Sequence, residues 1–421
     1  MDQDKKKIAG IAILIVMLFG GIALVSILLS KKEATTGFEH TPLAASTDLA
    51  QAGILLQGEG YLRWIDPMQP SKPEINKIDA EVSSDQLKWG VNRQSTDYYK
   101  VSPDGKFLAV LEPFGNKDPN SVENKIVIYN LTSGDSSTLI KANLNDLITS
   151  VSWDFSSQSV SFVTTKKIKT NNEFPFALFT GGSKKNKSYI NSAGLFDSKT
   201  TTKELAATGS YYGDYNPKVI ASNGNTYYVF DKGSLITVSS EVTKDKASFD
   251  EYYDIKIYNS NDYKRAIISS SSKTIIYDLE KKEKKTVLTS ASNNIYSGRI
   301  ISAALSPDKS GIAFIKNTSG KSTDYYGTTL DDSVDTLWYY DFETRKYTQI
   351  FSKGTSLDYR YPNYTSIAIS PDGKKIALLF NVNQNEKPIP NYSFEIYPIA
   401  ENSSPIITTT GNEESTILRW Q

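Results

Sequence analysis

The sequence predicts an all-β fold, a seven-bladed β-propeller preceded by one N-terminal transmembrane helix. Three observations predict it: a hairpin motif that recurs along the chain, a second strand pattern that follows most copies, and an uncharged apolar run near the N-terminus. The count is seven with bounds of six and eight, because two of the repeated units are degenerate. Recurring units of this size are typical of propellers and solenoids.

The hairpin motif is clearest at residues 367–380, IAISPDGKKIALLF, where one apolar strand enters a polar turn and a second leaves it. Related segments stand at 101–110, 151–163 and 303–316. Proline at the second turn position fixes φ near about −65°, aspartate tolerates the third position, and glycine or a small polar residue closes the turn. Four related hairpins in one chain constitute an internal repeat.

A second pair of strands follows most of these hairpins. An apolar strand ends in Tyr or Phe beside Asp or Asn, and a more polar strand follows after a turn. The copies are 125–140, 193–205, 273–288, 335–351 and 393–407. A strand buried on both faces is nearly all apolar, whereas an exposed edge strand is rich in Lys, Thr and Ser. Two such hairpins therefore make one four-stranded antiparallel unit.

The units take up most of the chain beyond its N-terminal segment. They cover residues 88–140, 144–205, 206–245, 252–289, 298–351 and 360–410. Segments 218–230 and 255–269 are the degenerate ones, since they stand where SPDG-type hairpins are expected. The two remaining ends, 54–75 and 415–421, are expected to join as a seventh unit, because radial closure removes the exposed sheet edges.

The motif SPDGK-x-(I/L)-A, at residues 370–377 and 102–109, resembles the TolB-like and prolyl-oligopeptidase-type propellers of the WD-like superfamily. The resemblance covers most of residues 53–421. It implies the propeller fold, in families that include periplasmic binding proteins and propellers that gate a peptidase domain. It implies no particular activity, because one fold carries many functions.

Composition excludes several classes of function. Lys plus Arg and Asp plus Glu both number 47, so no basic surface for nucleic acid is indicated. The chain has no cysteine, which excludes disulfides, Cys-ligated metals and a lipobox anchor. His40 is the single histidine, so a Ser/His/Asp triad and a His-rich zinc site have no basis. We therefore expect no metal, no cofactor and no assigned catalytic residue.

The N-terminal segment predicts a membrane anchor. Residues 8–30 are uncharged, with lysines on both sides, and at about 1.5 Å per residue they span a hydrocarbon core of about 30 Å. A cleaved signal peptide is the alternative, although its apolar region is usually about 7–15 residues. We expect a cytoplasmic tail (1–7), the anchor (8–30), a linker (31–52) and a propeller (53–421) outside the cytoplasm, in a single-pass protein of the cell membrane.

Long insertions and tyrosine-rich segments are expected to share one face. Insertions at 115–124, 166–192, 317–335 and 381–391 separate the second and third strands of their units, and blade-to-blade segments open onto the same face. Tyrosine offers an apolar ring and a hydroxyl, which suits recognition of a peptide or sugar. The candidate binding residues are Tyr98, Tyr99, Tyr212, Tyr215, Tyr325, Tyr326, Tyr359, Tyr361, Asp97, Asp214, Asp358 and Arg360. The alternative is that these tyrosines begin strands and pack between blades.

Two other segments have open interpretations. Residues 173–182, EFPFALFTGG, lie in the longest insertion between lysine-rich flanks and predict a partner-docking or membrane-touching loop; the alternative is an extra hairpin that covers its own blade. Residues 281–285, KKEKK, are expected at a solvated edge turn.

Three functions remain open from the sequence. The first is a binding or scaffold module of a cell-envelope complex, which recognises an envelope protein or glycan. The second is a carboxylate-dependent enzyme on envelope carbohydrate, of glycosidase or lyase type, with Asp97, Asp214, Asp331 and Asp332 as candidates. The third is a structural spacer in a secretion or pilus machine. Buried carboxylates at the channel mouth would favour the enzyme.

Overall fold

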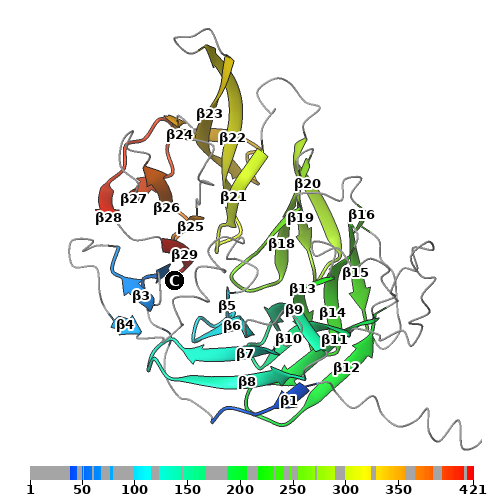
Figure 1. Ribbon diagram of the computed structural model, residues 1–421. Coiled ribbons are helices and arrows are strands. Elements are labelled where there is room, and N and C mark those ends of the chain that lie inside the picture. The colour runs from blue at the N-terminus through cyan, green and yellow to red at the C-terminus, as the bar shows by residue number, and fades with distance from the viewer. Residues whose placement is uncertain are drawn as a thin grey trace, which may run out of the picture.

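A computed structural model shows the chain as seven antiparallel sheets arranged radially, so the seven-bladed propeller is confirmed (Figure 1). It describes residues 38–44, 50, 52–58, 61–67, 76–78, 99–114, 123–143, 146–166, 187–205, 217–231, 233–239, 247–248, 255–270, 273–289, 299–323, 329–355, 366–382, 391–411 and 415–421. Within these ranges all regular structure is strand. No helix in the described part of the chain is long and apolar enough to cross a membrane, and the expected anchor lies outside that part.

The strands follow one another blade by blade. Blade I holds β5 (Tyr99–Val101), β6 (Phe107–Phe114), β7 (Glu123–Asn130) and β8 (Ser136–Ala142). Blade II holds β9 (Asp146–Trp153), β10 (Ser159–Lys166), β11 (Lys187–Gly194) and β12 (Thr200–Glu204). Blade III holds β13 (Lys218–Asn223), β14 (Thr226–Asp231), β15 (Ser234–Val238) and β16 (Ala247–Ser248). Blade IV holds β17 (Lys256–Asn259), β18 (Arg265–Ser269), β19 (Lys273–Asp278) and β20 (Glu283–Thr289).

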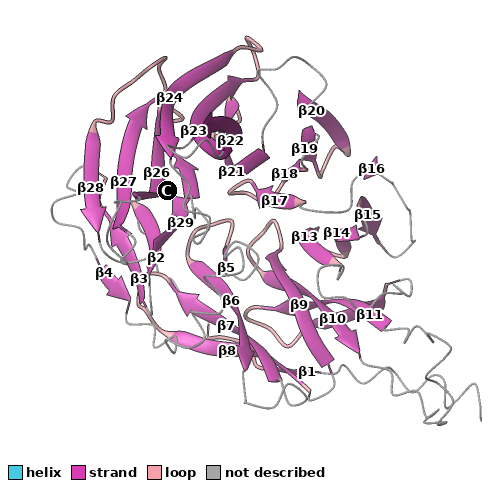
Figure 2. Cartoon of the chain, turned by 45° about the horizontal axis from the view of Figure 1, so that its top comes forward, coloured by secondary structure: helices cyan, strands magenta, loops and turns pink. Residues whose placement is uncertain are grey.

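The remaining blades complete the ring. Blade V holds β21 (Arg299–Leu305), β22 (Gly311–Thr323), β23 (Thr329–Asp341) and β24 (Tyr347–Thr355). Blade VI holds β25 (Ser366–Ile369), β26 (Lys375–Val382), β27 (Asn391–Pro398) and β28 (Ile407–Gly411). Blade VII joins the last strand, β29 (Ser415–Trp420), to β2 (Ile54–Gly58), β3 (Tyr61–Ile65) and β4 (Asn76–Ile78). The first strand of each blade lies toward the centre (Figure 2).

Blade VII confirms that the two ends of the propeller sequence close the ring. β2 pairs with β29 from Ile54 opposite Trp420 to Gly58 opposite Ser415. Two further backbone hydrogen bonds extend the pairing, from Gly53 N to Gln421 O (2.7 Å) and from Gln421 N to Gly53 O (3.0 Å). The innermost strand of this blade is therefore the C-terminal strand of the chain.

Apolar side chains from neighbouring blades form the core. Trp64 of blade VII packs with Leu108 and Tyr129 of blade I, and its indole N–H donates to Leu131 O at 3.2 Å. Trp153 of blade II is fully buried and donates to Lys100 O of blade I at 2.6 Å. Each indole thus fills an interblade seam and satisfies its polar atom there.

Antiparallel connectivity gives the propeller two chemically different ends. The turns between strands one and two, and between strands three and four, lie at one end of every blade, which we call the turn face. The connections between strands two and three, and from one blade to the next, lie at the other end, the loop face. Every innermost strand that continues from the preceding blade therefore begins at the loop face and ends at the turn face.

The turn face is built on a serine–aspartate bond within the repeated turn. In blade VI the Ser370 hydroxyl donates to Asp372 Oδ1 (2.5 Å) and accepts from Lys375 N (2.9 Å), and Lys374 N also donates to Asp372 Oδ1 (3.1 Å). The serine bond, with the Lys374 N–H second, lowers the pKa of the Asp372 carboxyl. Gly373 follows at φ 69°, a left-handed conformation in which glycine is unstrained.

The degenerate hairpin at 255–269 contains the same turn. Ser260 donates to Asp262 Oδ1 at 2.6 Å and accepts from Arg265 N at 3.0 Å. Tyr263 takes the position of the glycine, at φ 57°. Both turns keep the serine–aspartate bond although proline and glycine are replaced in blade IV, and in blade II the order is reversed, with the Ser156 hydroxyl donating to Asp154 Oδ1.

Two segments differ from their expected structure. Residues 317–335 were expected as a loop-like insertion, but most of them extend β22 and β23, which stay paired from Gly311 opposite Asp341 to Thr323 opposite Thr329. The continuous backbone ladder explains this, because it satisfies the polar groups of a segment that has few apolar residues. The expected linker, 31–52, contains β1 (Phe38–His40), which adds a fifth strand to blade I.

We predict that Ser370→Ala lowers the free energy of unfolding by about 1–2 kcal/mol, because a buried hydroxyl with two hydrogen bonds is lost. Ser137→Ala, on the exposed part of β8, is the control and should change it by less than about 0.5 kcal/mol. Denaturant unfolding followed by tryptophan fluorescence measures both. Equal stability of the two variants would contradict the role given to the serine.

Candidate functional site: the central channel

A ring of contacts, most of them at the turn face, links each blade to the next. Blades I to IV are joined by Asp104 N to Ser157 Oγ (3.0 Å), Gly224 N to Asp154 Oδ2 (3.0 Å) and Asn259 Nδ2 to Ile220 O (2.6 Å). Blades IV to VI are joined by Lys309 to Asp262 (3.5 Å) and by the close approach of Gly373 to Asp308. Blade VII is linked to blade I at the turn face by Gln421 Nε2 to Gly105 O (3.1 Å), and to blade VI nearer the loop face by Ile417 N to Ser366 Oγ (2.8 Å) at the start of β25.

Arg419 crosses the inside of this ring. It projects from β29 of blade VII, and its guanidinium donates to Ser102 O (2.5 Å) and Pro103 O (2.8 Å) of blade I. The same group reaches Asn261 O of blade IV at 3.5 Å. Burial lowers the pKa of the Arg419 guanidinium. Arg419 therefore blocks the channel at the turn face and ties three blades together.

An aromatic side chain supports this plug. Tyr263 of blade IV is only 4% exposed, and burial raises the pKa of its phenol, against the smaller opposing effect of the Arg419 charge. Nearby in the ring, Phe155 of blade II stacks on Tyr228 of blade III with ring centroids 5.9 Å apart. Among the described residues, the turn face is therefore packed with structural contacts around Arg419 and Tyr263.

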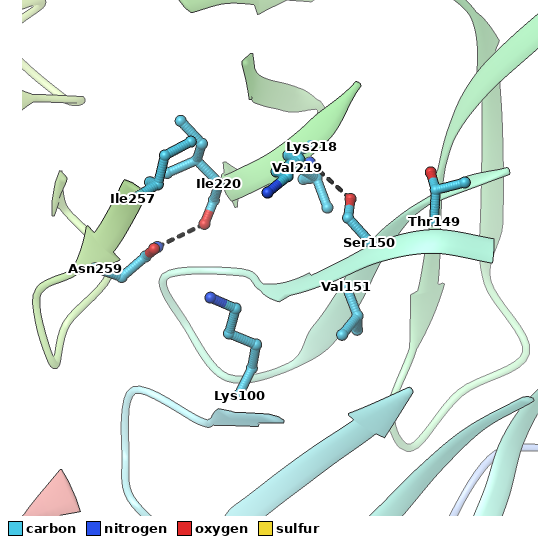
Figure 3. A pocket seen from close by; sticks show the side chains of 9 residues that line it. All are labelled: Lys100, Thr149, Ser150, Val151, Lys218, Val219, Ile220, Ile257 and Asn259. Atoms are coloured by element: carbon cyan, nitrogen blue, oxygen red, sulfur yellow. Dashed lines mark hydrogen bonds between the residues drawn. The ribbon is translucent and has the colours of Figure 1, made fainter. Parts of the chain in front are cut away.

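A hollow lies between the innermost strands of blades I to IV (Figure 3). Its volume is about 20 Å³, so it is a small hollow with room for about one water molecule. Nine residues line it: Lys100, Thr149, Ser150, Val151, Lys218, Val219, Ile220, Ile257 and Asn259. Lys218 and Val219 open β13 and Thr149 to Val151 lie within β9, so the hollow extends from the loop-face side of the ring.

The hollow is basic and rich in hydrogen-bonding groups. Lys100 and Lys218 supply ammonium groups from strands on different blades, and no carboxylate or imidazole is among the nine lining residues. The Ser150 hydroxyl accepts from Val219 N (2.8 Å), and the Asn259 amide donates to Ile220 O (2.6 Å), which fixes the wall between blades II, III and IV. Among these nine described residues there is no acid–base pair, and the two lysines bring positive charge to the hollow.

The predicted binding residues fall mostly outside the described part of the chain. Tyr99 is described: it is 8% exposed and packs against Leu55, Leu62 and Trp64 of blade VII. Tyr99 therefore packs between blades, which is the alternative interpretation given for these tyrosines in the sequence analysis. The others lie outside the described residues, namely Asp97, Tyr98, Tyr212, Asp214, Tyr215, Tyr325, Tyr326, Asp358, Tyr359, Arg360 and Tyr361.

The other predicted features have mixed outcomes. Residues 173–182 lie outside the described part. Asp331 and Asp332 belong to β23, but their side chains lie outside the described part as well. The segment 281–285 is exposed at the turn between β19 and β20, as expected, and Lys285 lies over the Phe342 ring of blade V at 4.8 Å.

Lys100, Lys218 and Arg419 were missed by sequence reasoning. A signal was present, because each is a cation within an innermost strand, where apolar residues are expected. The strands that carry Lys100 and Arg419 are separated by most of the chain, so no local spacing connects them. Only the radial closure brings them to the same channel.

Comparisons with known proteins found distant structural similarity. No family model and no curated protein matches the chain. Among solved structures, it is similar to a periplasmic gluconolactonase of Pseudomonas aeruginosa, at 10% identity and TM-score 0.45 over 87% of this chain and 100% of that one. It is also similar to hydrazine synthase of Kuenenia stuttgartiensis (12%, 0.40, over 72% and 76%) and acylaminoacyl peptidase of Pyrococcus horikoshii (14%, 0.39, over 73% and 44%).

We predict that Arg419→Met lowers the free energy of unfolding by about 2–4 kcal/mol, because three backbone carbonyls lose a charged donor. Arg419→Lys keeps the charge but not the planar fork, so its loss should be intermediate. Lys346→Met, at an exposed position of blade V, is the control. Denaturant unfolding measures all three, and a loss no larger than that of the control would contradict the role of Arg419 as a plug.

We predict that Tyr99→Ala lowers the free energy of unfolding by about 3–5 kcal/mol, the usual cost of removing a buried aromatic ring. The same denaturation experiment measures this loss. Wild-type stability in this variant would show that the seam between blades VII and I does not depend on the ring, and would return Tyr99 to the set of candidate binding residues.

Proposed function

We propose that this chain is a membrane-anchored, extracytoplasmic β-propeller that serves as a binding or scaffold module of a cell-envelope complex. The ligand, an envelope protein or glycan, is recognised at the loop face and presents an anionic group to the central hollow. The anchor is residues 8–30, and the tyrosine-rich segments provide the outer contacts.

One observation carries the proposal: Arg419 crosses the ring at the turn face, and the nine described residues that line the hollow beyond it include two lysines and no carboxylate. Ammonium groups on a wall of hydroxyl and amide groups bind carboxylate or phosphate oxygens through charge-assisted hydrogen bonds. Rigid innermost strands hold these groups in place, so little conformational entropy is lost on binding.

The carboxylate-dependent enzyme has less support. The candidate carboxylates Asp97 and Asp214, and the side chains of Asp331 and Asp332, lie outside the described part of the chain. The aspartates of the repeated turns, such as Asp372 and Asp308, bond to serine hydroxyls at the turn face, away from the hollow. Lowered pKa values keep these two carboxyls ionised, whereas a general acid needs a raised one.

The experiment is capture of partners from detergent-solubilised membranes by the full chain. Two test variants run beside it. One combines Lys100→Ala and Lys218→Ala in the hollow. The other changes Tyr98, Tyr212, Tyr325 and Tyr361 to Ala on the loop face. We expect each variant to capture at least tenfold less of the partner than the wild type, because each removes a part of the same surface.

A matched control removes the same number of charges elsewhere. Lys281→Ala with Lys284→Ala alters the exposed edge of blade IV near the turn face and should capture as much as the wild type. Equal loss in test and control variants would indicate a non-specific charge effect. Full capture by both test variants would refute binding at the loop face, and release of reducing sugar from envelope glycan by the wild type would favour the enzyme.

A further inference from the structure

A short strand from the expected linker is docked on the outer edge of blade I. β1 pairs antiparallel with β8, with Phe38 opposite Ala142 and His40 opposite Ile140. The chain then continues along the seam between blades I and II, where Thr41 N donates to Leu139 O (2.9 Å) and Leu43 N donates to Leu195 O (2.8 Å). We call residues 38–43 the strap.

Side-chain contacts also hold the strap in place. Phe38 is 7% exposed and meets the Phe162 ring of blade II edge-on, with centroids 4.9 Å apart. The His40 imidazole makes a 2.9 Å hydrogen bond to Gly194 O, also in blade II. The strap therefore joins two blades and covers an edge that would otherwise present unpaired backbone groups.

The direction of β1 fixes the side from which the chain arrives. β8 runs from the turn face at Ser136 to the loop face at Ala142, and Phe38 pairs with its last residue. The residues before Phe38 therefore join the propeller at its loop face. In Figure 1, β1 lies alongside β8 at the outer rim of the ring.

The distance to the expected anchor is short. Only residues 31–37 separate Phe38 from the end of the apolar run at Ser30, and a fully extended chain covers at most about 28 Å over that interval. β8 alone is about 23 Å long at about 3.3 Å per residue. If the turn face lay on the membrane instead, residues 31–37 would have to run along the side of blade I. That path would use nearly their whole extended length.

From this geometry we propose that the strap holds the propeller with its loop face toward the bilayer, so that the rim of blades I and II at this face is a membrane-facing surface. The proposal rests on the anchor in the proposed function.

The test uses the full chain in lipid vesicles and compares two heights on blade I. The chain has no cysteine, so Asn143→Cys and Ser133→Cys each accept one fluorophore at an exposed position. Asn143 follows β8 at the loop face, and Ser133 precedes it at the turn face. We expect stronger energy transfer to headgroup acceptors in the outer leaflet from position 143, by an amount that corresponds to about 20 Å of height.

A control variant separates the strap from the anchor. Insertion of about 20 Gly and Ser residues after Gly37 lengthens the tether but leaves both ends intact, and it should reduce the difference between the two positions. Equal transfer from both positions in the native-length chain, or stronger transfer from position 133, would overturn the orientation. Release of the chain from vesicles by alkaline carbonate would overturn the anchor, and with it the proposed function as well.

Discussion

The pairing of β29 with β2 is the interaction on which the rest of the structure depends. Seven twisted sheets arranged radially leave two open blade sides unless the last blade meets the first, and here one blade takes strands from both ends of the propeller sequence. The closure fixes the position of Arg419, because β29 is the innermost strand of that blade. The guanidinium can then reach carbonyls of blades I and IV at once. A contact that plugs the channel thus exists only in the closed ring.

The repeated turn shows how much of the fold can be predicted from the sequence. Four SPDG-like hairpins predict the blades because proline, aspartate and glycine have known places in tight turns. The hairpin of blade IV looked degenerate because Tyr263 replaces glycine at a left-handed position, which side chains seldom adopt. Its Ser260 to Asp262 bond keeps the turn, and the tyrosine gains a buried place beside Arg419. The turn of blade IV therefore keeps the expected residue types at Ser260 and Asp262, which form its hydrogen bond. It departs from them at Tyr263, which is buried beside Arg419.

The rest of the candidate site could not be predicted because it depends on contacts between distant segments. Lys100 and Lys218 stand on strands of different blades, and nothing in their spacing shows that they share a hollow. β1 is three residues long within a polar stretch, too short for a period of two to be visible, and it forms because β8 offers an unpaired edge. Tyr99 could be located in a strand from the sequence, but its role could not be predicted. A tyrosine at the start of a strand has the same sequence pattern whether it packs between blades or faces a ligand.

The two ends of the propeller differ in how their described polar groups are used. At the turn face, serine hydroxyls, backbone N–H groups and the Arg419 guanidinium are committed to contacts that link neighbouring blades. A ligand group that entered there would have to break contacts on which closure depends, which is why the proposed binding surface is placed at the loop face. The strap joins the propeller at that same face. In the proposed orientation, the basic hollow therefore opens toward the gap between propeller and bilayer, which favours partners that are themselves embedded in the membrane or lie flat upon it.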